Sequence, residues 1–150
     1  MTDTVANDAP LRVLMMGLGD EIFAIEAGMV REIIDPVPAT RVAGAKPHLP
    51  GVVNVRGNVI PLADIRVRFG MERGPATADT RIVVMEVEID GDPVVVGVIA
   101  DKVHDVTEIM PSDCQEAPRI GLHWRPEYIR FIARWNDEFI VIPEMDRILN

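Results

Sequence analysis

Residues 49–66 constrain the fold more than any other stretch of this chain. Three β-branched residues within 52–55 favour a strand, and residues 56–58 (Arg-Gly-Asn) supply a turn. A second strand follows, and Pro61 is expected to stop it because proline lacks a backbone donor. The segment therefore predicts a tight β-hairpin, followed by a short helical segment near residues 64–69.

One cation, Arg56, lies at the tip of this otherwise apolar hairpin. A charged side chain held on a rigid turn is well placed to meet a partner. It could equally be a solvated turn residue, or pair with Glu32 for a purely structural reason. An exposed ion pair adds at most about 1 kcal/mol to stability, so stability alone would be a weak use for it.

Short strand-like segments separated by turn residues occupy most of the chain. Alternating or continuous apolar residues predict further strands at 11–16, 22–25, 81–89, 94–100, 103–109, 129–135 and 138–142. In 129–135 the alternation groups Ile129, Phe131, Ala133 and Trp135 on one face. Residues 28–34 fit a helix or a strand, 71–79 and 111–126 read as loops, and 144–149 as a short helix. About ten short strands predict an all-β fold, either one barrel or a pair of barrels.

Composition narrows the class of protein. A chain of 150 residues with 48% apolar residues is typical of one globular domain. A net charge of −9 argues against nonspecific binding to nucleic acid or to an anionic membrane. The polar start lacks the pattern of a signal peptide, and no apolar run suggests insertion in a membrane. We expect a flexible leader over residues 1–10, a single domain over residues 11–150 and a cytoplasmic location.

Residue types that enzymes use are present without catalytic spacing. The only cysteine, Cys114, excludes an intramolecular disulfide, and neighbouring acids should raise its pKa, which argues against a nucleophile. The histidines are scattered, without metal-ligand spacing: His48, His104 and His123. His48 reads as a surface residue. The candidate carboxylates are expected to be solvated: Glu26, Glu32, Asp64 and Asp101. We expect no catalytic residues, metal or cofactor, and a small hydrolase with clustered carboxylates stays as the enzymatic alternative.

The hairpin segment resembles the signature of the CheW-type coupling proteins of bacterial chemotaxis, approximately G-V-x-N-L-R-G-x-x-x-P-V-x-D-L-R. The matching residues are Gly51, Val52, Asn54, Arg56, Gly57, Pro61, Asp64 and Arg66. A second family pattern, V-x-E-I, is present at residues 30–33, and a third, G-x-x-V-D-x-V, at residues 97–103 with Ala100 in place of its first valine. The resemblance extends from Leu11 to Leu149.

This resemblance implies a fold of two intertwined five-stranded barrels of SH3-like shape. It also implies two partners, the cytoplasmic tip of methyl-accepting chemoreceptors and the regulatory domain of a CheA-type histidine kinase. Val30, Glu32 and Arg56 match positions at or near the groove that receives the receptor tip. Gly51 and Gly57 would shape the hairpin that presents Arg56. No residues are assigned to the kinase interface, and the isolated chain is expected to be a monomer, recruited to membrane-associated receptor arrays.

The C-terminal part departs from the family pattern. Residues 130–131 are Arg-Phe where the family usually has a small residue, and Pro143 is expected to break the last strand early. These departures leave an alternative open: a module of the same fold in another kinase pathway, such as surface motility or biofilm control.

Overall fold

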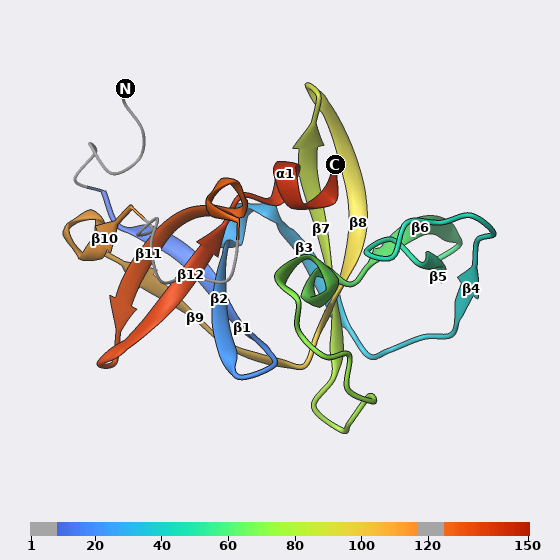
Figure 1. Ribbon diagram of the computed structural model, residues 1–150, viewed down its shortest axis with the longest axis horizontal. Coiled ribbons are helices and arrows are strands. Elements are labelled where there is room, and N and C mark those ends of the chain that lie inside the picture. Colours follow the sequence, from blue (N-terminus) through green and yellow to red (C-terminus); the bar gives the residue numbers. More distant parts are fainter. Residues whose placement is uncertain (1–8, 117–124) are drawn as a thin grey trace.

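Two six-stranded sheets form the protein, and the chain passes from the first to the second and back. The computed structural model describes residues 9–116 and 125–150 (Figure 1). The first sheet, in the spatial order β10-β11-β12-β2-β1-β9, contains β1 (Leu11–Leu18), β2 (Glu21–Glu26), β9 (Lys102–Ile109), β10 (Cys114–Gln115), β11 (Ile129–Trp135) and β12 (Glu138–Pro143). The second, in the order β3-β7-β8-β6-β5-β4, contains β3 (Val30–Ile34), β4 (Ala39–Arg41), β5 (Gly51–Val55), β6 (Asn58–Ala63), β7 (Arg81–Ile89) and β8 (Asp92–Ala100).

The prediction of an all-β, intertwined fold is confirmed. Both ends of the chain build the first sheet, and the middle builds the second. Parallel pairing of β12 with β2, and of β6 with β8, joins hairpins that are distant in sequence. Each sheet has five longer strands and one very short edge strand, β4 or β10, which is why the sheets have six strands where five were expected.

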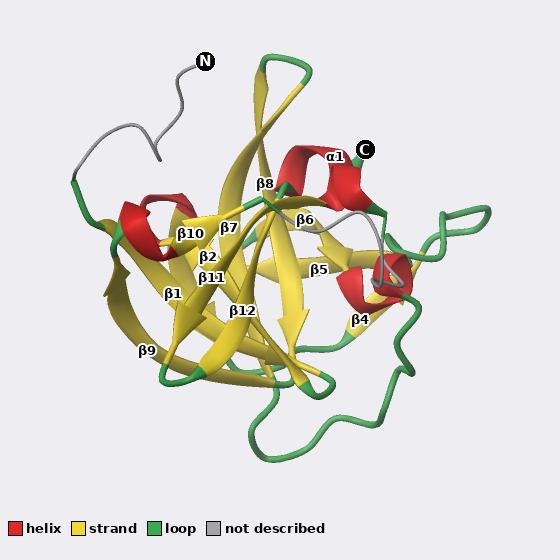
Figure 2. Cartoon of the chain, turned by 60° about the vertical axis from the view of Figure 1, so that its left-hand side comes forward, coloured by secondary structure: helices red, strands yellow, loops and turns green. Residues whose placement is uncertain are grey.

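Short helical segments lie at the ends of strands (Figure 2). They are η2 (Ala27–Met29), η3 (Ile65–Phe69), η4 (Pro111–Asp113), η5 (Pro126–Tyr128) and α1 (Met145–Leu149). The predicted helical segments near 64–69 and 144–149 are therefore confirmed. Residues 28–34, which fitted either structure, begin in η2 and continue as β3. The predicted loop at 71–79 is present.

Three apolar clusters hold the fold together. The largest contains residues of both sheets, among them Leu14, Phe23, Val83, Met85 and Val98, and it lies between them. A second cluster uses residues of the first sheet, and a third residues of the second. Each sheet thus has an apolar layer of its own besides the shared one, as expected of two barrel-like units that pack together.

Pro61 does not stop its strand, contrary to the sequence-based prediction. β6 continues to Ala63, and Pro61 lies opposite Val52 in the β5–β6 pair. Since the ladder begins with the Val55–Asn58 pair beside a two-residue turn, alternation makes Val52–Pro61 a pair that exchanges no hydrogen bonds. The missing N–H of Pro61 therefore costs no bond to β5.

Two predictions for the C-terminal strands were also wrong: that Pro143 breaks the last strand early, and that Ile129 and Phe131 share one face of their strand. β12 pairs with β11 as far as its last residue, Pro143, which lies opposite Ile129, so the proline does not shorten the pairing. The register shifts between Ile129 and Phe131, and the shift places Ile129 in the shared cluster while Phe131 lies in the first sheet's own cluster. A one-residue irregularity moves side chains to the opposite face.

Two predictions extend beyond the part of the chain that the structure describes. Residues 1–8 of the expected leader lie outside it, as do residues 117–124 of the loop predicted at 111–126. The described ends of that loop contain η4, β10 and the start of η5. Within residues 9–116 and 125–150, no helix has the length and apolar character needed to cross a membrane.

Candidate functional site

The β5–β6 turn presents Arg56 on a tightly defined backbone. Arg56 and Gly57 both have positive φ, 53° and 87°, as a two-residue hairpin turn of type I′ requires. The Gly57 N–H donates a hydrogen bond to Asn54 Oδ1 at 2.9 Å, which closes the turn. The side chain of Arg56 is 78% exposed. The cation thus projects into solvent from a turn whose backbone is fixed.

Glu32 of β3 and Arg56 form an ion pair. Arg56 Nε donates to Glu32 Oε1 at 3.1 Å and to Oε2 at 3.2 Å, and Arg56 Nη2 lies 3.1 Å from Oε1. The hydrogen bond to Glu32, followed by its charge, raises the pKa of Arg56 above its usual value. The pair borders a small cavity of about 100 Å³ whose apolar lining includes Val84 and Val95. The structure therefore brings together two of the three residues that the resemblance assigned to the receptor groove.

Val30 lies apart from this pair. A register shift between Val30 and Glu32 interrupts the β3–β7 ladder, and Val30 packs against the apolar cluster shared by the sheets. Glu32 instead borders the cavity beside the second sheet's own cluster, which includes Val84. β3 is an edge strand, so both of its faces can be approached from that edge. Two neighbouring apolar residues are also exposed, Ile33 on β3 (42%) and Val59 on β6 (65%).

The two glycines singled out by the resemblance occupy different kinds of position. Gly57 lies in the turn itself. Gly51 is the first residue of β5, and a Cβ atom there would lie 2.3 Å from the carbonyl oxygen of Thr40 on β4. Such a contact is far inside van der Waals distance, so Gly51 permits the close approach of β4 and β5.

A buried ionic cluster was missed by reasoning from the residues. Arg66 is 5% exposed and Asp64 3%, contrary to the expectation that this carboxylate is solvated. Arg66 Nε donates to Asp64 Oδ1 at 2.8 Å, and Nη1 to Asp101 Oδ1 at 2.7 Å. Asp101 Oδ2 accepts from the N–H of Gly19, in the β1–β2 turn, at 2.7 Å. The cluster links the two sheets, and the only sequence signal for it was that all three charged residues belong to the family patterns.

His48 is buried, and the expectation of a surface residue was wrong. It is 3% exposed, and its Nε2 lies 3.1 Å from Arg68 Nη2. Arg68 Nε also donates to the carbonyl oxygen of Ile148 in α1 at 3.0 Å. Burial, and then the charge of Arg68, lower the pKa of His48 below its usual value. His48 thus takes part in the junction between the β4–β5 loop, η3 and the C-terminal helix.

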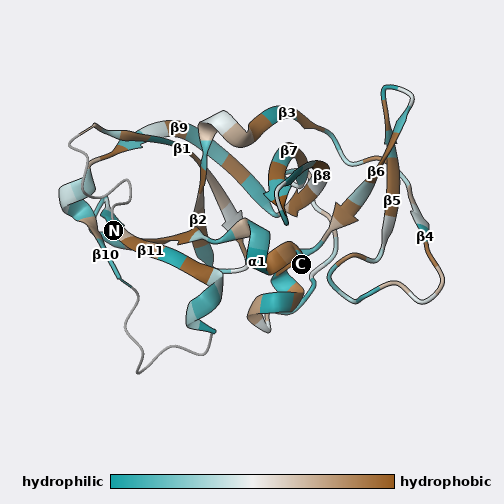
Figure 3. Cartoon of the chain, turned by 90° about the horizontal axis from the view of Figure 1, so that it is seen from above, coloured by the Kyte–Doolittle hydropathy of each residue, from teal (hydrophilic) through white to brown (hydrophobic). Residues whose placement is uncertain are grey.

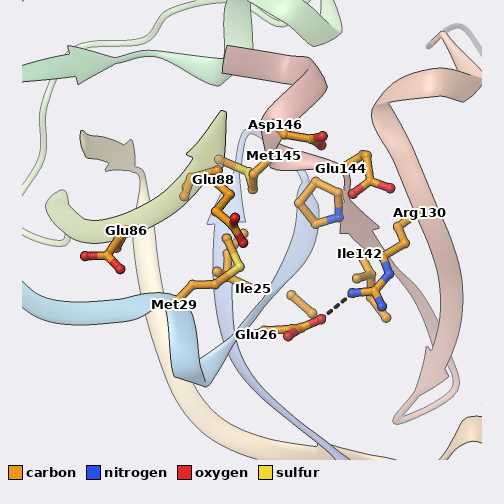
Figure 4. Close-up of a pocket in the computed structure, with 13 residues that line it drawn as sticks. Ile25, Glu26, Met29, Glu86, Glu88, Arg130, Ile142, Glu144, Met145 and Asp146 are labelled. Carbon is orange, nitrogen blue, oxygen red and sulfur yellow. Dashed lines mark hydrogen bonds and ion pairs between the residues drawn. The ribbon is translucent and has the colours of Figure 1, made fainter. Parts of the chain in front are cut away.

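A larger cavity of about 350 Å³ lies where β2, β7 and β12 approach α1 (Figure 4). Its lining combines apolar residues with several carboxylates, and Arg130 forms an ion pair there with Glu26. Burial, followed by the charge of Asp146, raises the pKa of Glu144. Within the described residues, no group of three histidine, cysteine or acidic residues is arranged to hold a metal ion.

The pKa of Cys114 is raised by burial and then by Asp113, which confirms the predicted direction and adds burial as the larger cause. A thiol with a raised pKa is a poor nucleophile at neutral pH.

The Glu32–Arg56 pair has a different character. It is an exposed ion pair on an edge strand and a turn, close to exposed apolar residues, and such a surface is suited to contact with another protein.

Comparisons with known proteins agree with this class. A family model described as "CheW-like domain" matches residues 12–150. The chain is 30% identical over 131 residues to a chemotaxis protein CheW of Rhizobium meliloti, covering 87% of this chain and 82% of that protein. It is 29% identical over 143 residues to a chemotaxis protein CheW of Helicobacter pylori, covering 95% and 84%. In structure it is similar to the scaffolding protein TtCheW of Thermoanaerobacter tengcongensis, with a TM-score of 0.82, 25% identity, and coverage of 95% of this chain and 89% of that one.

The SH3-like fold and its similarity to a solved scaffolding protein indicate a scaffold or adaptor class of protein. Within that class, this chain belongs to the CheW-like family. The family match and the names of its relatives support a chemotaxis adaptor, and they do not favour the alternative of a module in another kinase pathway.

Proposed function

We propose that this chain is a non-enzymatic adaptor that couples methyl-accepting chemoreceptors to a CheA-type histidine kinase. The observation that carries the proposal is the Glu32–Arg56 pair on β3 and the β5–β6 turn, in a chain that matches the CheW-like family over residues 12–150. The adaptor needs no cofactor, works in the cytoplasm at membrane-associated receptor arrays, and is a monomer when isolated. Residues 11–150 act as one domain.

The receptor side of the adaptor comprises Val30, Glu32 and Arg56. Arg56 has five N–H donors, and Glu32 engages only part of them, so the guanidinium can also donate to a carboxylate of the receptor tip. The ion pair holds the long Arg56 side chain in place before binding, which lowers the entropy lost on association. Because Val30 lies on the other face of β3, the receptor tip would contact the edge of this strand.

The mechanism is geometric. One surface holds the receptor tip and another holds the kinase regulatory domain, and the state of the receptor biases kinase activity through these contacts. The buried cluster of Asp64, Arg66 and Asp101 supports such coupling because it ties the second sheet to a turn of the first. A rigid connection between sheets lets a force applied at one surface reach the other.

Calorimetric titration tests the proposal, with a receptor-tip fragment and the kinase regulatory domain as separate ligands. We expect both to bind, and Arg56→Glu to weaken receptor binding by about tenfold or more, since it places like charges at the contact. Arg12→Glu, an exposed charge reversal on β1, is the matched control and should bind the receptor fragment normally. Kinase binding without receptor binding would indicate a different input, and binding of neither would refute the adaptor.

A further inference from the structure

The β4–β5 loop and Arg73 surround a cavity with an unusual charge. Arg41, Lys46 and Arg73 line this cavity of about 310 Å³, which we term the cationic cup. Its remaining lining residues are Val42, Gly44, Ala45, Pro47 and Pro50. Among the residues that the structure describes, no carboxylate lines the cup, although the chain contains 24 acidic residues against 15 lysines and arginines. The cup therefore has a local positive potential, although the protein as a whole is negatively charged.

The three cations of the cup have no ion-pair partner among the described residues. All three side chains belong to exposed residues. Other arginines of this chain do lie within ion-pair distance of a carboxylate, namely Arg31, Arg56, Arg66, Arg81 and Arg130. Like charges that converge on one cavity repel each other, and an anion bound between them removes that repulsion.

The loop that carries the cup is anchored. The N–H of Leu49 donates to the carbonyl oxygen of Lys46 at 2.9 Å, and that of Ala45 to Val42 at 3.1 Å. The N–H of Asp64 donates to the carbonyl oxygen of His48 at 2.9 Å, and the buried His48 side chain contacts Arg68. Arg41 and Lys46 therefore stand on a backbone that is already ordered, which lowers the entropy cost of binding.

The cup also has an apolar component. Val42 is 48% exposed, and the pyrrolidine rings of Pro47 and Pro50 complete the rim. A small inorganic anion would satisfy the cations but leave this apolar surface in water. A polypeptide segment with carboxylates next to an apolar side chain would satisfy both, because specific protein contacts combine an apolar centre with a charged rim.

We propose that the cationic cup is a docking surface for an acidic segment of a partner protein. The surface is separate from the Glu32–Arg56 pair. Arg41 lies opposite Gly51, the first residue of β5, whereas Arg56 follows Val55 at the other end of that strand, and Figure 3 shows β4 at the end of the second sheet that is remote from the first. The net charge of −9 repels an acidic partner at long range, so the cup selects where such a partner docks rather than how fast it arrives. The proposal does not depend on the receptor contact.

The test is a two-dimensional NMR titration of the ¹⁵N-labelled protein with an acetylated, amidated peptide of alternating Glu-Asp-Leu residues. The counter-probes are the same peptide with Gln and Asn in place of its acids, and inorganic phosphate. The test variant combines Arg41→Gln, Lys46→Gln and Arg73→Gln. The control variant removes the same charge elsewhere, by Arg12→Gln, Lys102→Gln and Arg134→Gln, all at exposed residues. Both variants are checked for folding by circular dichroism.

We expect the acidic peptide to shift the amide signals of residues 41–46 and 73. The test variant should bind the peptide about tenfold more weakly, whereas the control should bind it normally. Raising NaCl from about 50 mM to about 500 mM should weaken binding through screening. The neutral peptide should leave these signals unchanged.

Four results would overturn the proposal. Absence of localised shifts would mean that the cup binds no acidic segment. Equal weakening of peptide binding in both variants would mean that the affinity depends on the net charge of the protein and not on the cup. Phosphate binding as tightly as the peptide would define a small-anion site instead. Concentration-dependent self-association of the free protein, lost in the test variant, would identify a second copy of this chain as the occupant.

Discussion

At the scale of single residues, burial separates two ion pairs that look alike in the sequence. Arg56 and Glu32 meet at the surface, whereas Arg66 and Asp64 meet where their side chains are 6% and 4% exposed. An exposed pair is screened by water and contributes little to folding. A buried pair is different, because removing one partner leaves the other charge without compensation in a poorly solvated site.

We therefore expect Arg66→Gln to lower the free energy of unfolding by about 3–5 kcal/mol, as for other broken buried pairs. Asp64 and Asp101 would lose their shared cation, and the repulsion between them would add to the loss. Urea denaturation followed by circular dichroism measures the change. Arg56→Gln serves as control, and it should leave the denaturation midpoint almost unchanged. Equal effects of the two substitutions would contradict this account of burial.

Cys114 allows a second measurement on one residue. Because burial and Asp113 raise its pKa above the usual 9.0, less thiolate is present at pH 8 than for a small thiol. We expect slower reaction with Ellman's reagent than N-acetylcysteine shows at that pH. The rate should continue to rise above about pH 9, as the remaining thiol ionises. A rate that levels off below that pH would mean that the thiol is activated.

At the scale of elements, the pairing of β4 with β5 depends on one glycine. Gly51→Ala would place a methyl group 2.3 Å from the carbonyl oxygen of Thr40, and neither backbone can move without losing ladder hydrogen bonds. We expect a loss of about 1–3 kcal/mol in the free energy of unfolding, as for other overpacked sites. Faster amide hydrogen exchange in β4 would place the damage at this pair.

Gly28→Ala is the matched control for this substitution. A Cβ at Gly28 meets no atom within 4 Å, and its φ is not positive. It should leave stability and exchange in β4 unchanged. If both alanine variants lose the same stability, the close approach of β4 is not the reason why Gly51 is needed.

The elements also show where local pattern is reliable. Hairpins with short turns and alternating residues were predicted, because a turn residue and a period of two depend only on neighbours in the chain. The register shift at Arg130 and the passage of β6 through Pro61 were not. Both depend on which backbone groups face a partner strand, and that is a property of the pair rather than of either strand.

At the scale of the whole molecule, protonation of the His48 side chain affects stability, because His48 is buried at the junction of the β4–β5 loop, η3 and the C-terminal helix. Burial is the largest cause of the shift in its pKa; the charges of Arg68 and Lys46 also disfavour its charged form, whereas a hydrogen bond with the backbone of Leu149 favours it. Its folded-state pKa is lowered, so the unfolded chain binds the proton more readily. Stability should therefore be lost as pH falls below the unfolded value of 6.5, until the folded-state pKa is reached.

Thermal unfolding between about pH 5 and pH 8 measures this dependence. His48→Gln should flatten the slope of stability below the unfolded value. The raised pKa of Glu144 acts in the opposite sense, since its contribution is present at low pH and lost as pH rises above 4.5. An unchanged slope in His48→Gln would show that other groups cause the dependence.

The candidate site was only partly visible in the sequence. The family patterns singled out Glu32 and Arg56, but whether they pair, and with what exposure, depends on the pairing of β3 with β7 and on the turn beside them. Val30 belongs to the same V-x-E-I pattern as Glu32. It nevertheless lies on the other face of β3, because the register shifts next to it.

The amino-acid sequence by itself determined the all-β class, most hairpins and the short helical segments, since these follow from periodicity, β-branched residues and turn chemistry. Only the tertiary structure decided which strands share a sheet, through the parallel pairs β2–β12 and β6–β8. It also decided that Arg66 and His48 are buried. The physical reason is that burial and ion pairing depend on segments far apart in the chain, and no local pattern specifies which of them will meet.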